Sequence, residues 1–140
     1  MLKEIQVNKS KQMVYLMDES YHVYAELPIG TDYYEGTNED GQPYSNVDDG
    51  IYPVTWIDVD YPNALTSAYG WGYINIDERG RALHGGGGNL GYVGAVAPYQ
   101  DQLCPTLGCF RMYNVHIFFL CHEAKRSRNA DIDVVIHVVS

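Results

Sequence analysis

The segment Tyr21-His22-Val23-Tyr24-Ala25-Glu26-Leu27 alternates in polarity, with apolar residues at its odd-numbered positions and His22 and Glu26 sharing the other face. This period of two predicts a half-buried β-strand and leaves His22 at the surface. Two shorter runs rich in Val, Ile, Tyr and Leu, residues 4–7 and 13–17, precede it, and turn-forming residues separate the three runs. The beginning of the chain therefore predicts a three-stranded meander.

Short strands also dominate the rest of the chain. Residues 51–59 and 71–76 have the composition of strands, and Leu83-His84 ends a further short one. Residues 131–139 alternate at first and then contain the apolar run Val134-Val135-Ile136, which predicts a final buried strand.

One helix is predicted near the C-terminus, over residues 113–125. Val115, Phe118, Phe119 and His122 recur at helical spacing and would form its buried face. Three basic residues follow at its end, where the negative end of the helix dipole favours them: Lys125, Arg126 and Arg128. Together these elements predict a mainly β (α+β) fold, a β-sandwich or open barrel with one helix, in a single domain over residues 1–140.

The composition excludes several classes of protein. The 140 residues include 9 Lys and Arg against 18 Asp and Glu, a formal net charge of −9, and 46% hydrophobic residues, which is ordinary for a globular domain. So acidic a chain suits neither nucleic acid nor an anionic membrane surface, because both require Lys and Arg; a neutral or cationic ligand fits better. No apolar run is long enough to span a membrane, and the first residues show no signal-peptide pattern.

Residues 30–50 predict a long loop. They are polar, rich in Gly, Asn and Asp, and without periodicity, and long loops in compact domains commonly form lids or binding surfaces. Tyr33, Tyr34 and Tyr44 are therefore candidate substrate contacts. The whole chain has 13 Tyr beside 2 Trp and 3 Phe. Two interpretations of this bias remain. Tyr is a good strand residue whose hydroxyl can stay hydrated, or the tyrosines line a groove that binds sugars or peptide amides.

Two segments carry residue types suited to covalent catalysis. His84 precedes a glycine-rich stretch, residues 85–94, and Pro-Thr-Leu-Gly-Cys-Phe-Arg-Met occupies residues 105–112. A cysteine nucleophile needs a base, donors for an oxyanion and room for the substrate. Cys109 lies just ahead of the predicted helix and close to Arg111, and both favour a thiolate. Gly108 would let N–H groups face an oxyanion, and His84 would be the base if the fold brings the two segments together.

These two segments resemble the catalytic signature of the YkuD-type L,D-transpeptidase family, in which His-Gly begins a glycine-rich loop and Ser/Thr-His-Gly-Cys carries the nucleophile. Residues 5–16 resemble the opening hairpin of that domain, and residues 28–31 the segment after its third strand. Residues 49–54 resemble its Thr-Pro-x-Gly-x-Tyr/Phe element, and residues 132–138 its closing strand. The resemblance covers nearly the whole chain in order and implies an L,D-transpeptidase-like fold with one helix after the catalytic cysteine.

The resemblance implies a peptidoglycan-modifying cysteine enzyme that acts on stem tetrapeptides. Cys109 would attack the carbonyl of the third stem residue, typically diaminopimelate, and expel the terminal D-Ala to leave a thioester acyl-enzyme. A neighbouring stem amine would then give transpeptidation, whereas water would give L,D-carboxypeptidase activity. His84 would be the base, oriented by a carbonyl within residues 85–88. The implied catalytic residues are Cys109, His84, Gly108 and Gly85, and the implied substrate-binding residues are Arg111, Thr106, Tyr92 and Gly86.

The chain departs from the family pattern at two points. Leu107 occupies the position of the usual histidine and cannot donate a hydrogen bond, which puts the turnover rate in question. The separation of His84 from Cys109 is longer than usual and includes Cys104. The combination of His-Gly-Gly-Gly-Gly with Thr-Leu-Gly-Cys resembles a variant branch associated with phages and prophages. That origin would explain a cell-wall enzyme without a signal peptide.

Other functional interpretations have less support. Gly86-x-Gly88-x-x-Gly91 fits a dinucleotide-binding fingerprint, but Gly94 and Pro98 interrupt any helix that would follow. His-Gly-Gly-Gly also occurs in lipase oxyanion loops, but none of the serines lies in a Gly-x-Ser-x-Gly sequence.

The cysteines leave further alternatives open. A zinc site would use His84, Cys104 and Cys109, with His116 or His122 as the fourth ligand. The spacing of these residues matches no paired-ligand pattern. Cys104 and Cys109 could instead form a disulfide, which would block the nucleophile, or Cys109 could be a structural thiol. Cys121 lies in the apolar part of the predicted helix and is expected in the core.

Two classes of function therefore remain. The first is an L,D-transpeptidase or L,D-carboxypeptidase with Cys109 and His84, for which we expect no metal and no cofactor. Its partners would be peptidoglycan stem peptides and carbapenem-type inhibitors, without nucleic acid or membrane insertion. The second is a non-catalytic cell-wall-binding or virion structural module that keeps the fold, for which Leu107 is the main argument. Either would act at the cell wall or in the periplasm, by an unknown delivery route.

Overall fold

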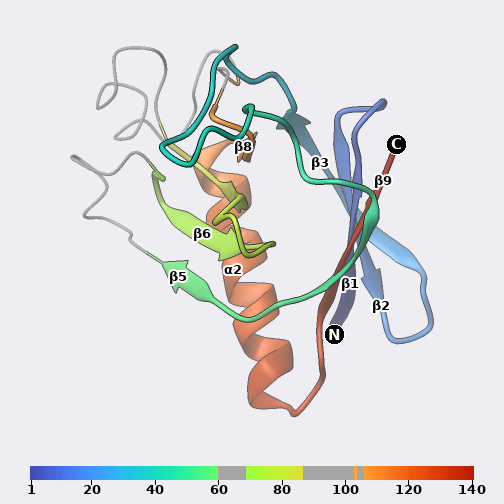
Figure 1. The fold of residues 1–140 in the computed structure, drawn as a ribbon. Helices are drawn as coiled ribbons and strands as arrows, with labels where there is room; N and C mark the ends of the chain where they lie inside the picture. Colours follow the sequence, from blue (N-terminus) through green and yellow to red (C-terminus); the bar gives the residue numbers. More distant parts are fainter. Residues whose placement is uncertain (60–68, 87–102, 104–105) are drawn as a thin grey trace.

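The structure, a computed structural model, describes residues 1–59, 69–86, 103 and 106–140. Within these ranges it contains the following elements: β1 (Leu2–Asn8), β2 (Met13–Asp18), β3 (Val23–Gly30), β4 (Gly50–Pro53), β5 (Ile57–Val59), β6 (Gly72–Asn75), β7 (Ala82–His84), β8 (Phe110–Met112), α2 (Asn114–Asn129) and β9 (Val135–Val139). The strands form one mixed sheet in the order β4-β9-β1-β2-β3-β8-β7-β6-β5. The sheet is strongly curled, so that β5 and β6 flank α2 on one side and β1, β2 and β9 lie on the other (Figure 1). The predicted mainly β fold with one late helix is confirmed.

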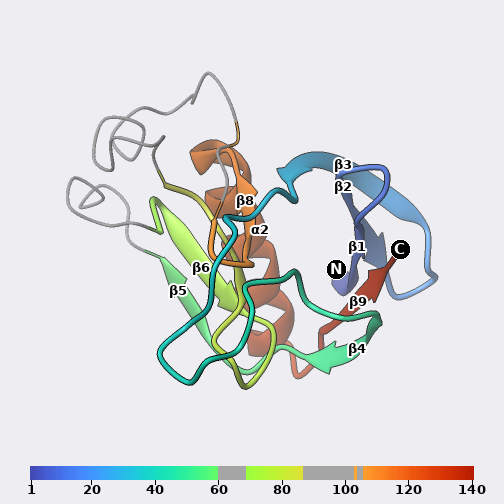
Figure 2. The same ribbon diagram turned by 45° about the horizontal axis from the view of Figure 1, so that its top comes forward.

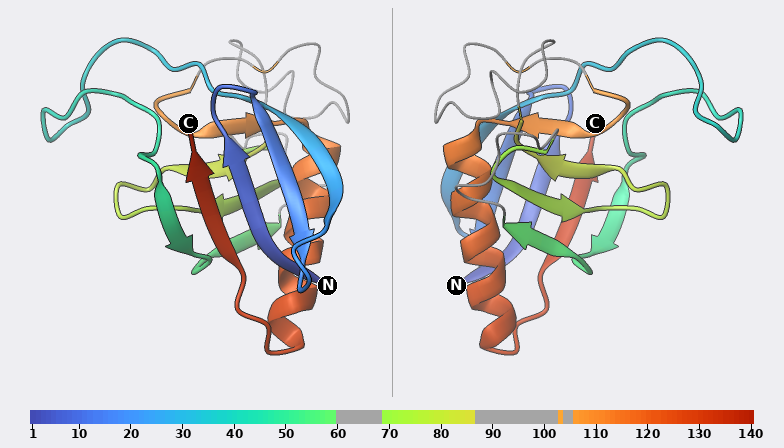
Figure 3. Two further views of the ribbon diagram at one scale, coloured as in Figure 1. Left: turned by 90° about the vertical axis from the view of Figure 1, so that its right-hand side faces the viewer. Right: turned by 90° about the vertical axis from the view of Figure 1, so that its left-hand side faces the viewer.

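The predicted meander forms one half of this sheet. β1 pairs antiparallel with β2, with Val7 opposite Val14, and β2 pairs antiparallel with β3, with Val14 opposite Leu27. β9 joins β1 in parallel, with Ile5 opposite Ile136. Figure 3 shows these four strands side by side, with α2 behind them. The side chains of all five residues are buried, because this face of the meander belongs to the core.

The strand predicted over residues 21–27 begins two residues later, at Val23. Tyr21 has a φ of +60° and belongs to the preceding turn, in which the Asp18 carboxylate accepts the N–H of His22 at 3.0 Å. The predicted alternation holds only toward the end of the strand. Val23 is 47% exposed because it pairs with Met17 at the open end of the meander, whereas Leu27 is 8% exposed. His22 is exposed, as predicted.

The single strand predicted over residues 51–59 is wrong. β4 ends at Pro53 and β5 begins at Ile57, and the two strands lie at opposite ends of the sheet. β4 pairs with β9, and β5 pairs with β6. Proline lacks the N–H that a continuing ladder needs, so the chain leaves one end of the sheet at Pro53 and rejoins the other.

The helix α2 is confirmed, but its buried face differs from the predicted one. The helix extends four residues beyond the predicted end and buries these side chains: Asn114, Ile117, Leu120, Cys121, Ala124 and Ser127. Phe119, which the periodicity placed inside, is 41% exposed. Phe118 packs its ring against Trp71 and His122 at centroid distances of 6.3 and 4.5 Å, so part of the aromatic surface is covered outside the core. No helix in the described ranges is long and apolar enough to cross a membrane.

β8 was not predicted and changes the surroundings of Cys109. It lies between β3 and β7, antiparallel to the first, with Ile29 opposite Met112, and parallel to the second, with Leu83 opposite Phe110. Phe110 and Met112 are fully buried. Cys109 therefore precedes a strand, and the expectation that it lies just ahead of the helix is wrong.

The segment between β3 and β4 is an irregular loop, as predicted. Its described backbone forms only isolated bridges, Tyr33 with Thr106 and Thr37 with Pro43. The loop runs beside β8 and β6 (Figure 2). It is anchored at its base, because Asn46 Nδ2 donates to the Thr31 carbonyl at 2.7 Å and the side chain of Val47 is fully buried.

Candidate active site

The histidine singled out by the sequence ends β7 and is almost completely enclosed. His84 is 3% exposed and lies opposite Tyr73 of β6 and Arg111 of β8. The ring of Tyr69 meets its imidazole edge to face, with centroids 5.0 Å apart. The Nδ1 atom is 2.5 Å from the carbonyl oxygen of Gly85. Because a carbonyl only accepts, Nδ1 must carry the proton, which leaves the lone pair on Nε2.

The surroundings of His84 keep its imidazole neutral. Burial lowers the pKa of His84 to about 4, the hydrogen bond to Gly85 opposes this shift, and the positive charge of Arg111 adds to it. At neutral pH the ring is therefore unprotonated, which is the state that a general base needs. An imidazole with so low a pKa is a weak base.

Cys109 lies on the same face of the sheet as His84. It directly precedes Phe110, which pairs with Leu83, so Cys109 is beside Ala82, whose backbone forms a hydrogen bond with the Cys109 thiol. Ala82 and His84 are two residues apart in one strand, and residues at that spacing point to the same face. The parallel pairing of β7 with β8 therefore brings Cys109, His84 and Arg111 together.

The thiol of Cys109 is half-buried and protonated at neutral pH. Burial is the main cause that raises the pKa of this thiol, and the hydrogen bond with Ala82 opposes it. Among nearby charges, Asp77 raises the pKa, whereas Arg111 and Arg81 lower it. Because the thiol does not ionise by itself, a nucleophilic role requires a base beside it.

The turn before Cys109 depends on Thr106 and Gly108. The Thr106 hydroxyl donates to the Cys109 carbonyl at 2.7 Å and accepts the Gly108 N–H at 3.0 Å. Gly108 has a φ of +126°, and a Cβ at this position would collide with the Ser45 carbonyl oxygen. Leu107, at the tip of the turn, is 55% exposed. Of the N–H groups around Cys109 that were expected to face an oxyanion, that of Gly108 is thus engaged by Thr106.

A buried amide that the sequence analysis missed fixes the backbone after His84. The Oδ1 atom of Asn114, the first residue of α2, accepts the N–H groups of Gly86 at 2.9 Å and Trp71 at 3.3 Å. A Cβ on Gly85 would collide with the same oxygen atom. Gly85 and Gly86 therefore let the chain approach the start of α2 closely. An asparagine at the start of a helix is ordinary in sequence, so no local signal pointed to this long-range contact.

The remaining candidates divide between described and undescribed positions. Tyr92, Cys104 and the glycines between residues 87 and 94 lie outside the described residues. Cys109 and Cys121 are free thiols, and within the described ranges no group of three or more His, Cys, Asp or Glu side chains is arranged to hold a metal ion. The helical histidines pack on aromatic rings, His116 on Tyr113 and His122 on Phe118. Cys121 is fully buried, as predicted, and burial raises the pKa of its thiol to about 12.

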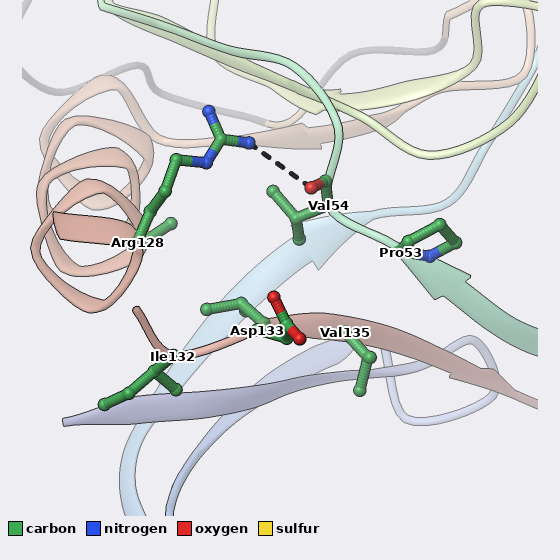
Figure 4. Close-up of a pocket in the computed structure, with 8 residues that line it drawn as sticks. Pro53, Val54, Arg128, Ile132, Asp133 and Val135 are labelled. Atoms are coloured by element: carbon green, nitrogen blue, oxygen red, sulfur yellow. Dashed lines mark hydrogen bonds between the residues drawn. The ribbon is translucent and has the colours of Figure 1, made fainter. Parts of the chain in front are cut away.

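A pocket of about 440 Å³ lies away from these residues, at the C-terminal end of α2 (Figure 4). Arg128 donates across it to the Val54 carbonyl at 3.3 Å, and Asp133 adds a carboxylate to its wall. His84 and Cys109 are instead close to the N-terminal end of the helix, where Asn114 contacts Gly86. None of the site residues that the sequence predicted lines this pocket.

No protein-family model and no curated protein matches the sequence. Solved structures do match. The L,D-transpeptidase of Xylanimonas cellulosilytica has a TM-score of 0.62 and 16% identity, over 98% of this chain and 60% of that one. A mutant L,D-transpeptidase of Enterococcus faecium has a TM-score of 0.64 and 12% identity, over 99% of this chain and 50% of that one. L,D-transpeptidase 1 of Mycobacterium tuberculosis has a TM-score of 0.57 and 11% identity, over 98% and 61%.

The curled mixed sheet and the helix α2 thus have an L,D-transpeptidase-like fold, which the resemblance in the sequence had implied. Identities this low establish the fold alone. The chain spans about 60% of the first of these structures and about 50% of the second, so the activity of the whole proteins does not transfer with the fold.

Proposed function

We propose that this chain is a peptidoglycan-modifying cysteine L,D-transpeptidase or L,D-carboxypeptidase, with Cys109 as nucleophile and His84 as base. The observation that supports this proposal best is the parallel pairing of β7 with β8, which sets His84 opposite Arg111 and Cys109 beside Ala82. It occurs in a fold shared with solved L,D-transpeptidases. A thiol and a neutral imidazole on one face of a sheet are the pair that nucleophilic catalysis requires.

The protonation states define the order of events. Nε2 of His84 takes the thiol proton while Sγ of Cys109 bonds to the carbonyl carbon of the third stem residue. The amide bond to the terminal D-Ala then breaks, and the proton passes from His84 to the departing amine. A thioester remains on Cys109. An acceptor amine or water attacks it, His84 removes the proton of this second nucleophile, and the thiol recovers a proton as it leaves.

The other site residues are assigned roles that follow from their positions. Gly85 orients His84 through its carbonyl, and Gly86 is held by Asn114. Arg111 lies opposite His84, where it would bind a carboxylate of the substrate. Thr106 holds the Gly108 N–H, which would have to leave the Thr106 hydroxyl to donate to an oxyanion. Tyr92 is retained as a proposed substrate contact.

The second candidate is a non-catalytic cell-wall-binding or virion module that keeps the fold. Two observations favour it: Leu107 is 55% exposed and has no hydrogen-bonding group in its side chain, and the Gly108 N–H is already satisfied within the turn. An oxyanion hole with one donor engaged loses much of its effect, because each such donor contributes about 10²–10³-fold to the rate.

The proposed substrate places the protein at the cell wall, and the Thr-Leu-Gly-Cys variant remains the argument for a phage or prophage origin. Covalent inhibitors are suitable probes. One structurally similar protein, Ldtfm, was solved as its carbamoyl enzyme with the inhibitor avibactam. It matches with a TM-score of 0.63 and 14% identity. We therefore expect carbapenem-type compounds to acylate Cys109.

The test is to incubate the purified protein with a carbapenem or with a disaccharide-tetrapeptide and to measure its intact mass. The wild-type protein should gain a covalent adduct that maps to Cys109, and the tetrapeptide should lose D-Ala. Cys109→Ala should form no adduct, and His84→Gln should form it about 10²–10⁴-fold more slowly.

Cys121→Ala is the matched control, because Cys121 is a buried thiol in the core. It should be acylated like the wild type. If the free thiol of Cys109 forms no adduct and the peptide is unchanged, the enzyme is excluded and the binding module is favoured. If Cys104→Ser abolishes activity while Cys109→Ala does not, the assignment of the nucleophile is wrong.

A further inference from the structure

A buried arginine joins three segments beneath the proposed nucleophile. Arg81 is 8% exposed and pairs with Asp77, with Nη2 2.6 Å and Nε 2.7 Å from the same carboxylate oxygen. Its Nη1 donates to the carbonyl oxygens of Ser45 and Asn46, each at 3.0 Å, and to the Ser45 hydroxyl at 3.1 Å. Buried arginines are rare unless paired, and here the partners belong to both the hairpin between β6 and β7 and the loop before β4.

The turn that carries Cys109 rests directly on this arrangement. A Cβ at Gly108 would collide with the Ser45 carbonyl oxygen and lie 3.2 Å from Cδ of Arg81. The carbonyl that Arg81 holds is thus the surface against which the Gly108 backbone packs. Arg81 also directly precedes Ala82, the residue whose backbone hydrogen-bonds Cys109. Cys109 is therefore connected to Arg81 through the chain and through space.

We propose that Arg81, held by Asp77, is a positioning residue that fixes the Cys109 thiol relative to His84 by clamping Ser45 against Gly108. That the positioned thiol is a nucleophile rests on the proposed function, whereas its positioning by Arg81 does not. It makes the loop before β4, together with the hairpin between β6 and β7, part of the support of the nucleophile.

The geometry explains why this position holds arginine. Its planar guanidinium donates in several fixed directions at once, whereas the ammonium of lysine is a point charge on a flexible stem. A buried ion pair adds little net stability compared with apolar residues of the same size, so its directional contacts are the more informative feature. The nearby charges shift the pKa of the thiol in opposite directions: Asp77 raises it, and Arg81 and Arg111 lower it. The neutral His84 and the hydroxyl of Tyr73 also lie near the thiol.

Two variants separate positioning from stability. In Arg81→Lys the charge stays but the clamp is lost, so the maximal rate of carbapenem acylation should fall about 10–100-fold, while the concentration for half-maximal rate changes little. The pH profile of iodoacetamide alkylation at Cys109 should move to higher pH, because the displaced thiol loses its bond with Ala82. Unfolding would move the profile the other way, toward an ordinary exposed thiol.

Asp77→Asn keeps the shape and removes the negative charge, so the alkylation profile should move to lower pH in a protein that still unfolds cooperatively. It carries the test if Arg81→Lys does not fold. Arg79→Lys is the matched control, because Arg79 is exposed and its guanidinium donates to the Pro43 carbonyl of the same loop, at 3.0 Å. It should leave both readouts unchanged.

The outcomes for this inference and for the proposed function are distinct. A wild-type protein that alkylates normally but never acylates contradicts the proposed function, and the two alkylation profiles still decide the role of Arg81. Profiles that neither Asp77→Asn nor Arg81→Lys moves would overturn the inference. So would an equal loss of acylation in Arg79→Lys.

Discussion

At the scale of single residues, burial decides the chemistry of the candidate pair. His84 and Cys109 are both desolvated, and desolvation favours the uncharged form of each, so the pKa of the imidazole falls and that of the thiol rises. Burial therefore favours a neutral thiol and a neutral imidazole over a preformed ion pair at neutral pH. The hydrogen bond from Nδ1 to Gly85 completes the arrangement, because it directs the free lone pair of the ring to Nε2.

The buried His84 predicts that stability depends on pH in a defined direction. Its pKa is about 4 in the folded protein against 6.5 in the unfolded chain, so the unfolded state binds more protons between these values. The stability is complete above 6.5 and is lost as the pH falls toward 4. When the pH falls from 7 to 5, the titration of His84 should lower the free energy of unfolding by about 2 kcal/mol. Urea unfolding at both pH values measures it, and His84→Gln should show a smaller difference; equal differences would contradict the prediction.

Gly108 predicts a large effect for a single added methyl group. Its φ of +126° is unfavourable for other residues, and a Cβ would also collide with the Ser45 carbonyl oxygen. Gly108→Ala should lower the free energy of unfolding by more than the about 1–3 kcal/mol that backbone strain alone costs. Gly41→Ala is the control, because Gly41 also has a positive φ, +77°, but an added Cβ there meets nothing within 4 Å. If both variants lose the same free energy of unfolding, the added Cβ at Gly108 does not collide with the Ser45 carbonyl oxygen, and the prediction is wrong.

At the scale of elements, the start of α2 connects the helix to the strands that carry the candidate site. Asn114 is the first helical residue and is fully buried, yet its Oδ1 serves two backbone N–H groups outside the helix. The helix thereby fixes the backbone that follows His84. Its far end is bound separately, because Ser127 donates to the Leu2 carbonyl at 2.6 Å. The helix thus links the meander to the strands that carry the site.

Asn114→Ala should therefore affect both stability and the site. It leaves the N–H groups of Gly86 and Trp71 buried without their acceptor, and each unsatisfied group costs about 1–3 kcal/mol. Thermal unfolding should show the loss, and carbapenem acylation of the folded variant should slow because the Gly85 carbonyl is no longer fixed. Asn129→Ala, at the exposed end of the same helix, is the control. A variant at Asn114 that behaves like the control would contradict this role.

At the scale of the whole molecule, the last strand joins the two ends of the chain. β9 lies between β4 and β1 and pairs with both, and its residues Ile136 and Val138 are fully buried. Without it β4 would have no partner in the sheet, because β9 is the strand with which β4 pairs. The fold therefore depends on residues that are distant in sequence.

Removal of residues 134–140 should abolish cooperative unfolding, because it deletes one strand and frees the edge of two others. Removal of Ser140 alone is the control. It loses exposed hydrogen bonds to Asp49, of which the one from the Ser140 hydroxyl is 2.5 Å long, and should unfold like the full chain. Circular dichroism during thermal unfolding distinguishes the two. A cooperative transition in the longer deletion would show that the sheet tolerates the loss of β9.

Local pattern in the sequence determined the meander, the final strand, the existence of the helix and the two segments that carry His84 and Cys109. These features depend on neighbours along the chain, whose periodicity and turn residues the sequence shows directly. The same local information failed where a choice depended on distant partners. Aromatic spacing suggested the wrong helix face, because the sheet accepts Ile117 and Ala124 and leaves Phe119 outside.

Only the tertiary structure decided which residues meet. The pairing of β7 with β8 puts Cys109 beside Ala82, and the buried contacts of Asn114 and Arg81 fix the backbone around it. Neither contact has a local signature, since an asparagine at a helix start and an arginine after a turn are ordinary in sequence. The sequence alone singled out the groups that we propose to react. Long-range burial and hydrogen bonding decided how they are held and in which protonation state, because desolvation depends on everything that surrounds a group in space.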